Sequence, residues 1–66
     1  MGKDRRIDNI LRMPEVQRRT SLSAATIYRR EKSGTFPARI RLGPKMVGWY
    51  ESDIGEWIAD SVGFQA

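Results

Sequence analysis

Between residues 20 and 34 the chain reads TSLSAATIYRREKSG, and the other elements are assigned relative to this run. Ser23 is a good N-cap because its hydroxyl can accept a hydrogen bond from a backbone N–H two or three residues later. Gly34 suits the left-handed conformation that follows many helices. The run therefore predicts a helix from Ala24 to about Ser33.

The step of about 100° between helical residues divides this helix into two faces when Ile27 is taken as the buried centre. The inward side also holds Ala24, Arg30 and Glu31. The outward side holds Ala25, Arg29 and Lys32, with Thr26 and Tyr28 on the flanks. The outward face is therefore basic and rich in hydrogen-bonding groups.

A shorter helix is predicted before this one, from Pro14 to about Arg19, because proline is well tolerated in the first turn of a helix. Residues 20–23 then read as a tight turn between the two helices. Ile10, Leu11 and Met13 form a short apolar patch, and residues 1–9 are expected to be a flexible basic arm.

A β-hairpin is predicted after Phe36-Pro37, which ends the helical region. Residues 38–42 alternate small or apolar with basic side chains, the period of a half-buried strand. Gly43-Pro44 is a turn signal, and residues 46–50 return as the second strand. The interpretation places Ile40, Leu42, Val47 and Trp49 inward, Arg39 and Arg41 on the exposed face, and Lys45 at the tip.

The last predicted element is a helix that begins near Glu51-Ser52-Asp53, where acidic residues suit a helix N-terminus. It ends by Gly63, which leaves residues 63–66 as a tail and residues 10–62 as one domain. Its apolar stripe is Ile54, Trp57, Ile58 and Val62. The predicted core of the domain is Leu22, Ile27, Phe36, Ile40, Leu42, Val47, Trp49, Ile54, Trp57 and Ile58.

Composition excludes several classes of function. The chain has 66 residues, no cysteine and no histidine. It is too short for a deep catalytic pocket, and it lacks disulfides, thiol chemistry and the usual zinc ligands. We expect no cofactor, metal or small-molecule ligand. No apolar run approaches the roughly 20 residues of a membrane span, and the charged N-terminus is unlike a signal peptide, so a soluble cytoplasmic protein is expected.

The charge is unevenly distributed. Residues 1–50 hold twelve Lys and Arg against four Asp and Glu, a net +8, and residues 51–66 hold four acids and no base, a net −4. A basic body with an acidic end favours a polyanionic partner on one side. Paired carboxylates can also act as acid–base groups or cation ligands. Helical spacing instead spreads these acids over an exposed surface, so no catalytic or metal site is predicted.

Two short helices, a tight turn and a basic hairpin predict a small α+β domain of the winged helix-turn-helix class that binds double-stranded DNA. The second helix would enter the major groove, and the hairpin wing would reach the backbone or the minor groove. The candidate DNA-binding residues are Ser23, Ala24, Ala25, Thr26, Tyr28, Arg29, Arg30, Lys32, Arg39, Arg41 and Lys45.

Each candidate has a structural alternative. Arg29 is the favoured base contact, although it could pair with Glu31, and Arg30 could equally pair with an acid. Tyr28 and Thr26 could bond a phosphate or pack internally. The alanines at positions 24 and 25 could touch a thymine methyl or simply favour the helix. The basic wing residues could be solvated.

The chain resembles the AlpA family of phage- and prophage-linked transcriptional regulators, within the broader group of excisionase-like and MerR-like winged helix domains. The matching pieces, in order along residues 10–60, are Pro14-Glu15-Val16, Leu22-Ser23, Thr26-Ile27-Tyr28-Arg29, Gly34-Thr35-Phe36-Pro37, Arg41-Leu42-Gly43-Pro44, Val47-Gly48-Trp49, Glu51-Ser52-Asp53-Ile54 and Glu56-Trp57-Ile58. The resemblance implies DNA binding through the second helix and the wing, and no enzyme activity.

The family pattern also differs from this chain in two places. Ser21 stands where such turns often have glycine, which predicts a backbone that is either mildly strained or differently shaped. Ala24-Ala25 replace the arginine or serine of many relatives. An excisionase-type recombination factor, or an antirepressor that binds protein through the last helix, remains an alternative. Assembly with itself on DNA or with a protein partner, the target sequence and the sign of regulation remain open.

Overall fold

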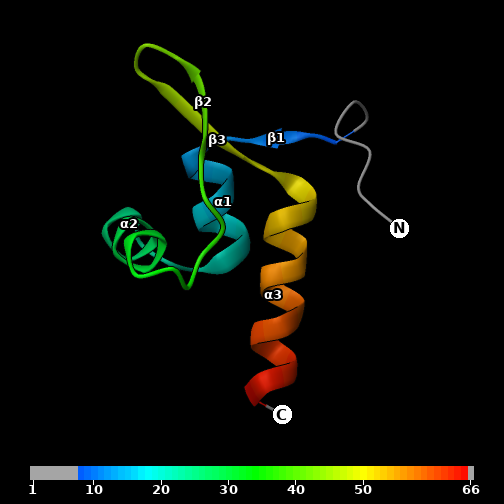
Figure 1. The fold of residues 1–66 in the computed structure, drawn as a ribbon. Helices are drawn as coiled ribbons and strands as arrows, with labels where there is room; N and C mark the ends of the chain where they lie inside the picture. Colours follow the sequence, from blue (N-terminus) through cyan, green and yellow to red (C-terminus); the bar gives the residue numbers. More distant parts are fainter. Residues whose placement is uncertain (1–7, 66) are drawn as a thin grey trace.

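The structure, a computed structural model, describes residues 8–65, and the side chains within them up to Ser61. The elements follow in the order β1 (Ile10–Leu11), α1 (Met13–Thr20), α2 (Ala24–Lys32), β2 (Ile40–Gly43), β3 (Met46–Tyr50) and α3 (Glu51–Gln65). In Figure 1 the β2–β3 hairpin projects beyond the helices, and α2 and α3 lie on either side of α1. This α+β arrangement is that of a winged helix-turn-helix domain, as the sequence predicts.

The turn between α1 and α2 contains the expected strain. Ser21 has φ 61° and ψ 23°, which is the left-handed region, and its N–H donates to the carbonyl oxygen of Gln17 at 2.7 Å. A side chain in this conformation costs roughly 1–2 kcal/mol, which glycine avoids. The α1 helix itself extends one residue beyond its predicted bounds at each end.

Helix α2 begins and stops for the reasons that the sequence gives. The Ser23 hydroxyl oxygen accepts from the N–H of Thr26 at 3.2 Å, and the hydroxyl donates to the Thr26 side-chain oxygen at 3.0 Å. The helix ends at Lys32, and Gly34 follows with φ 84°. The predicted cap and stop are both confirmed, and they fix which residues α2 exposes.

The sheet has three antiparallel strands in the order β1-β3-β2, one strand more than predicted. Strand β1 pairs Ile10 with Tyr50 and Leu11 with Trp49. A strand of two residues is too short to show an alternating pattern, and its partner lies far along the chain. The sequence therefore marks these residues only as an apolar patch.

Most of the expected N-terminal arm, residues 1–7, lies outside the described residues, but its last two residues are held against α3. The Asp8 carboxylate accepts from the backbone N–H of Ser52 at 3.2 Å and from its hydroxyl at 2.5 Å. The carbonyl oxygen of Asn9 accepts from the N–H of Glu51 at 2.8 Å. Asp8 and Asn9 thus satisfy N–H groups at the start of α3, and assigning them to an arm was wrong.

The prediction that Ile40 and Leu42 of β2 face the core was wrong. Ile40 lies opposite Gly48 and Arg41 lies opposite Val47, with an irregular register between Arg41 and Gly43. Ile40 is half-buried, and Leu42 is 39% exposed, so neither belongs to the core. Alternation gives the period of a strand but not which phase faces inward, and a shift of one residue exchanges the two faces.

Ile40 and Leu42 instead lie on the face of the sheet that points away from the core, and Gly48 accounts for the packing on this outer face. A Cβ atom at Gly48 would lie 2.6 Å from Cγ2 of Ile10 and 3.1 Å from Cδ1 of Leu42. The missing side chain lets these residues of β1 and β2 approach each other across β3.

The buried core joins all three helices to the sheet. It consists of Leu11, Val16, Ile27, Phe36, Trp49 and Ile54, with Met13, Leu22, Val47, Trp57 and Ile58 partly buried against it. Two indoles also hold the segment between α2 and β2. Trp49 Nε1 donates to the Pro37 carbonyl at 3.0 Å, and Trp57 Nε1 donates to the Thr35 carbonyl at 2.8 Å. The wing is therefore anchored to the core at its root.

Helix α3 continues to Gln65, past the predicted end at Gly63. A glycine inside a helix costs about 1 kcal/mol relative to alanine, which lowers helix stability without forcing a stop. Within residues 8–65, no helix is both long enough and apolar enough to cross a bilayer.

Candidate nucleic-acid interface

Nine of the eleven candidate residues are exposed, and only Ala24 and Thr26 are half-buried. Eight of the eleven lie on α2 or at its N-cap, and the other three belong to the wing or its root. The predicted outward face of α2 is therefore accessible, and so are the candidate residues of the β2–β3 hairpin and its root.

Arg29 is exposed in the C-terminal half of α2. Within the described part of the chain, neither Arg29 nor its neighbour Lys32 forms an ion pair with an acid. Glu31, which the sequence offers as a partner for Arg29, is bound by Arg39 instead. Arg29 thus presents a guanidinium that could donate to a base edge.

Arg30 occupies a different side of α2. It lines a hollow together with Trp57, Ile58 and Ser61 of α3. It is exposed and forms no ion pair within the described residues. Arg29 does not line this hollow, so the two arginines have different surroundings.

Two more of the candidate cations, Arg41 and Lys45, belong to the wing. Lys45 lies in the turn between β2 and β3, and Arg41 lies on β2, where its Nε donates to the Gly43 carbonyl at 3.4 Å. Both side chains are exposed. Arg12, which the sequence analysis did not single out, donates from Nε to the Val47 carbonyl at 3.0 Å and so ties the loop before α1 to β3.

The root of the wing is bound directly to α2. One Glu31 carboxylate oxygen accepts from the backbone N–H of Arg39 at 2.6 Å, and the other accepts from its guanidinium at 2.5 Å. The Arg39 guanidinium carbon lies 5.2 Å from the centre of the Tyr28 ring. Two predicted DNA contacts, Tyr28 and Arg39, are therefore brought together by an acid that the prediction did not include.

A second network joins α1 to the start of α3. Glu15 accepts hydrogen bonds from Arg18 and Arg19, and Arg19 NH1 also reaches Glu51 Oε2 at 2.9 Å. Hydrogen bonds from Arg18 and then Arg19 lower the pKa of Glu15 from 4.5 to about 2. Hydrogen bonds from Asn9 and then Arg19 lower the pKa of Glu51. The charges of Arg18 and Arg19 are thus partly offset within the protein.

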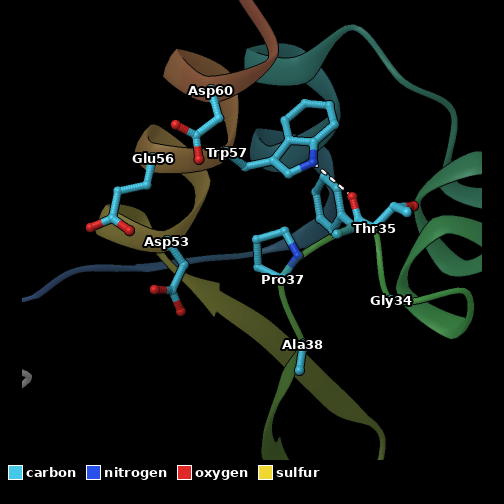
Figure 2. Close-up of a pocket in the computed structure, with 9 residues that line it drawn as sticks. Gly34, Thr35, Pro37, Ala38, Asp53, Glu56, Trp57 and Asp60 are labelled. Atoms are coloured by element: carbon cyan, nitrogen blue, oxygen red, sulfur yellow. Dashed lines mark hydrogen bonds between the residues drawn. The ribbon is translucent and has the colours of Figure 1, made fainter. Parts of the chain in front are cut away.

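The acids of α3 gather on another surface. Figure 2 shows Asp53, Glu56 and Asp60 beside Trp57 and the segment that follows α2, and they line an open hollow there. The dashed line in this view is the bond from the Trp57 indole to Thr35. Carboxylates repel phosphates, so this hollow is unsuited to the DNA backbone. None of the candidate cations lines this acidic hollow.

The chain is similar in sequence to known proteins of one family. Residues 9–62 match the family described as "Prophage CP4-57 regulatory protein (AlpA)". The chain is 45% identical over 56 residues to the DNA-binding transcriptional activator AlpA of Escherichia coli K12. The alignment covers 76% of this chain and 80% of that protein. The chain is also 38% identical over 55 residues to the uncharacterized protein ORF88 of Enterobacteria phage P4. This alignment covers 83% of this chain and 62% of that protein.

Proposed function

Because the chain belongs to the AlpA family of prophage regulatory proteins, we propose that it is a sequence-specific double-stranded DNA-binding transcriptional regulator of the phage or prophage type. The family is one of regulators rather than enzymes. The proposal places the protein in the bacterial cytoplasm, where it would act on the nucleoid. The E. coli relative, whose name describes a DNA-binding transcriptional activator, supports this proposal.

The observation that carries the proposal is the separation of charge between surfaces. Arg29, Lys32, Arg41 and Lys45 are exposed and form no ion pair within the described residues. The acids Asp53, Glu56 and Asp60 lie together on α3. A polyanion can therefore approach α2 and the wing without meeting the acidic surface.

In this proposal α2 lies in the major groove. Its first turn, with the Ser23 cap and small Ala25, faces a phosphate and allows close approach to the bases. Arg29 donates to a base edge and supplies sequence preference. Arg41 and Lys45 contact the neighbouring backbone or minor groove, which adds affinity with little sequence information.

The test is to measure binding to a DNA site that the protein itself selects from random sequences. Selection from a random duplex library identifies the preferred site, and affinity is then measured against salt for that site and a scrambled one. Contact with about 5–7 phosphates gives a slope of log K against log salt of roughly −5 to −6. Absence of binding at low salt, or affinity indifferent to salt, would exclude DNA binding through these cations.

A second candidate is a protein-binding antirepressor that uses α3. The acidic hollow beside Trp57 favours this alternative, because it offers aromatic surface edged by charge. Binding through aromatic contacts would persist at salt concentrations that release DNA. An excisionase-type role would use the same DNA contacts, and a recombination assay rather than a binding assay distinguishes it. Cooperative self-assembly on DNA would make the binding isotherm sigmoidal.

A further inference from the structure

The hollow between α2 and the root of the wing is lined by Tyr28, Glu31, Lys32 and Arg39. These residues come from two segments that the proposed function assigns to different parts of the DNA. The hollow thus joins a hydroxyl, an ammonium and a guanidinium at one place. This combination suits a phosphate, because ammonium and guanidinium groups form charge-assisted hydrogen bonds to phosphate oxygens.

The acid in this hollow does not offer a free carboxylate to an incoming anion. Both Glu31 oxygens accept hydrogen bonds from Arg39, one from the backbone and one from the guanidinium. The Glu31 side chain is only 14% exposed, whereas the Arg39 side chain is 46% exposed. The carboxylate is therefore covered and its charge is offset, while the cation remains accessible.

Arg39 keeps donors for a second acceptor. A guanidinium has five N–H donors in a planar fork, and the bond to Glu31 uses NH1. The Tyr28 ring lies 5.2 Å away and further restrains the guanidinium. A side chain held in this way loses less conformational freedom when it binds a ligand. Arg39 is thus preorganised by two residues of α2, Glu31 and Tyr28.

We propose that this hollow seats one phosphate of the DNA backbone. Arg39 and Lys32 bind the phosphate, and Glu31 is a positioning residue that holds Arg39 and aligns the wing with α2. This inference rests on the proposed function, and it makes an acidic residue of α2 necessary for binding an anion. Arg39 was expected on the exposed face of the wing, but its bonds to Glu31 hold it beside α2.

The charge of Glu31 gives the sharpest test. Removing an acid that merely stands near DNA strengthens binding, because the protein becomes more positive. Removing an acid that positions an arginine weakens binding. We therefore expect Glu31→Gln to bind the selected duplex about three- to tenfold more weakly than the parent, since a preorganised contact is lost. Asp60→Asn makes the same change of charge on exposed α3, and it should bind as tightly as the parent or slightly more tightly.

The phosphate is located with duplexes that have one neutral methylphosphonate, moved position by position. The parent should lose affinity at each contacted phosphate, and Arg39→Ala should be clearly less sensitive than the parent at one of these positions, near the wing. Arg39→Ala and Lys32→Ala should each flatten the salt slope by about one unit. A variant whose fold is merely perturbed would bind all duplexes more weakly and would not lose its response to a methylphosphonate at one position alone. Thermal melts of every variant confirm that it is folded at the assay temperature.

The outcomes separate this inference from the proposed function. A parent that binds duplex DNA while Glu31→Gln binds more tightly would overturn the positioning role of Glu31. An Arg39→Ala protein that retains the full methylphosphonate sensitivity of the parent would overturn the phosphate seat. A parent that binds no duplex would overturn the proposed function, and the phosphate seat would fall with it.

Discussion

Trp49 should be the most sensitive side chain in the domain. It is completely buried, it packs edge-on against Phe36 with ring centroids 6.4 Å apart, and its indole donates to the Pro37 carbonyl at 3.0 Å. Truncation of a buried tryptophan to alanine costs about 3–5 kcal/mol. A domain of this size has a free energy of unfolding of roughly 3–10 kcal/mol, from about 0.05–0.15 kcal/mol per residue. Trp49→Ala should therefore remove about a third or more of the free energy of unfolding.

Trp49→Phe is the more informative change. It keeps an aromatic ring but removes the indole donor to the part-buried Pro37 carbonyl, and a carbonyl left without a partner away from water costs about 1–3 kcal/mol. At about 4–8 °C per kcal/mol for a small domain, the melting temperature should fall by roughly 5–20 °C. Trp57→Phe is the matched control, because it removes a similar bond to Thr35 from a side chain that is only partly buried. Water can replace that bond, so the loss should be smaller.

The assay is thermal and urea unfolding followed by far-ultraviolet circular dichroism, with the urea slope as a check that both variants unfold in the same way. The expected order of stability is parent, then Trp57→Phe, then Trp49→Phe. If Trp49→Phe melts like the parent, or above Trp57→Phe, the bond to Pro37 does not anchor the wing as described.

Three further predictions concern the DNA surface, the turn and acid stability. Arg29→Ala should cost about 1–3 kcal/mol of binding to the selected site and reduce the difference from a scrambled site; an unchanged preference would remove Arg29 from base recognition. Ser21→Gly should raise the free energy of unfolding by about 0.5–1 kcal/mol, because glycine relieves the left-handed strain at some entropic cost, and a lower melting temperature would refute this. Because the folded pKa of Glu15 is lowered from 4.5 to about 2, its contribution to stability is present above pH 4.5 and is lost as the pH falls toward 2. Acid titration of Glu15→Gln should lack that part of the loss, and a profile that matches the parent's would contradict it.

Local signals explain what could be predicted from the sequence. The Ser23 cap and the Gly34 stop act within a few residues, so they fix α2 to within one residue of its observed end. The order of the helices and the hairpin follows from turn residues and apolar spacing. The exposed position of Arg29 follows from the helical step once Ile27 is buried.

The parts that the sequence did not predict depend on contacts between distant residues. Strand β1 is defined by pairing with β3, and the phase of β2 is set by the register opposite Gly48. The bond from Glu31 to Arg39 crosses the segment between a helix and a strand, so no helical or strand period reveals it. The Glu15 network did have a local signal, since acid and base are three and four residues apart on one helix.

The central claim is that α2 and the wing together form the DNA surface while α3 does not. The most direct measurement is a titration of isotope-labelled protein with the selected duplex, followed by the backbone amide resonances in NMR spectra. The largest shifts should fall on residues 23–32 and 39–46, and residues 53–60 should shift little. Shifts that concentrate on residues 53–60, with α2 and the wing unchanged, would contradict it.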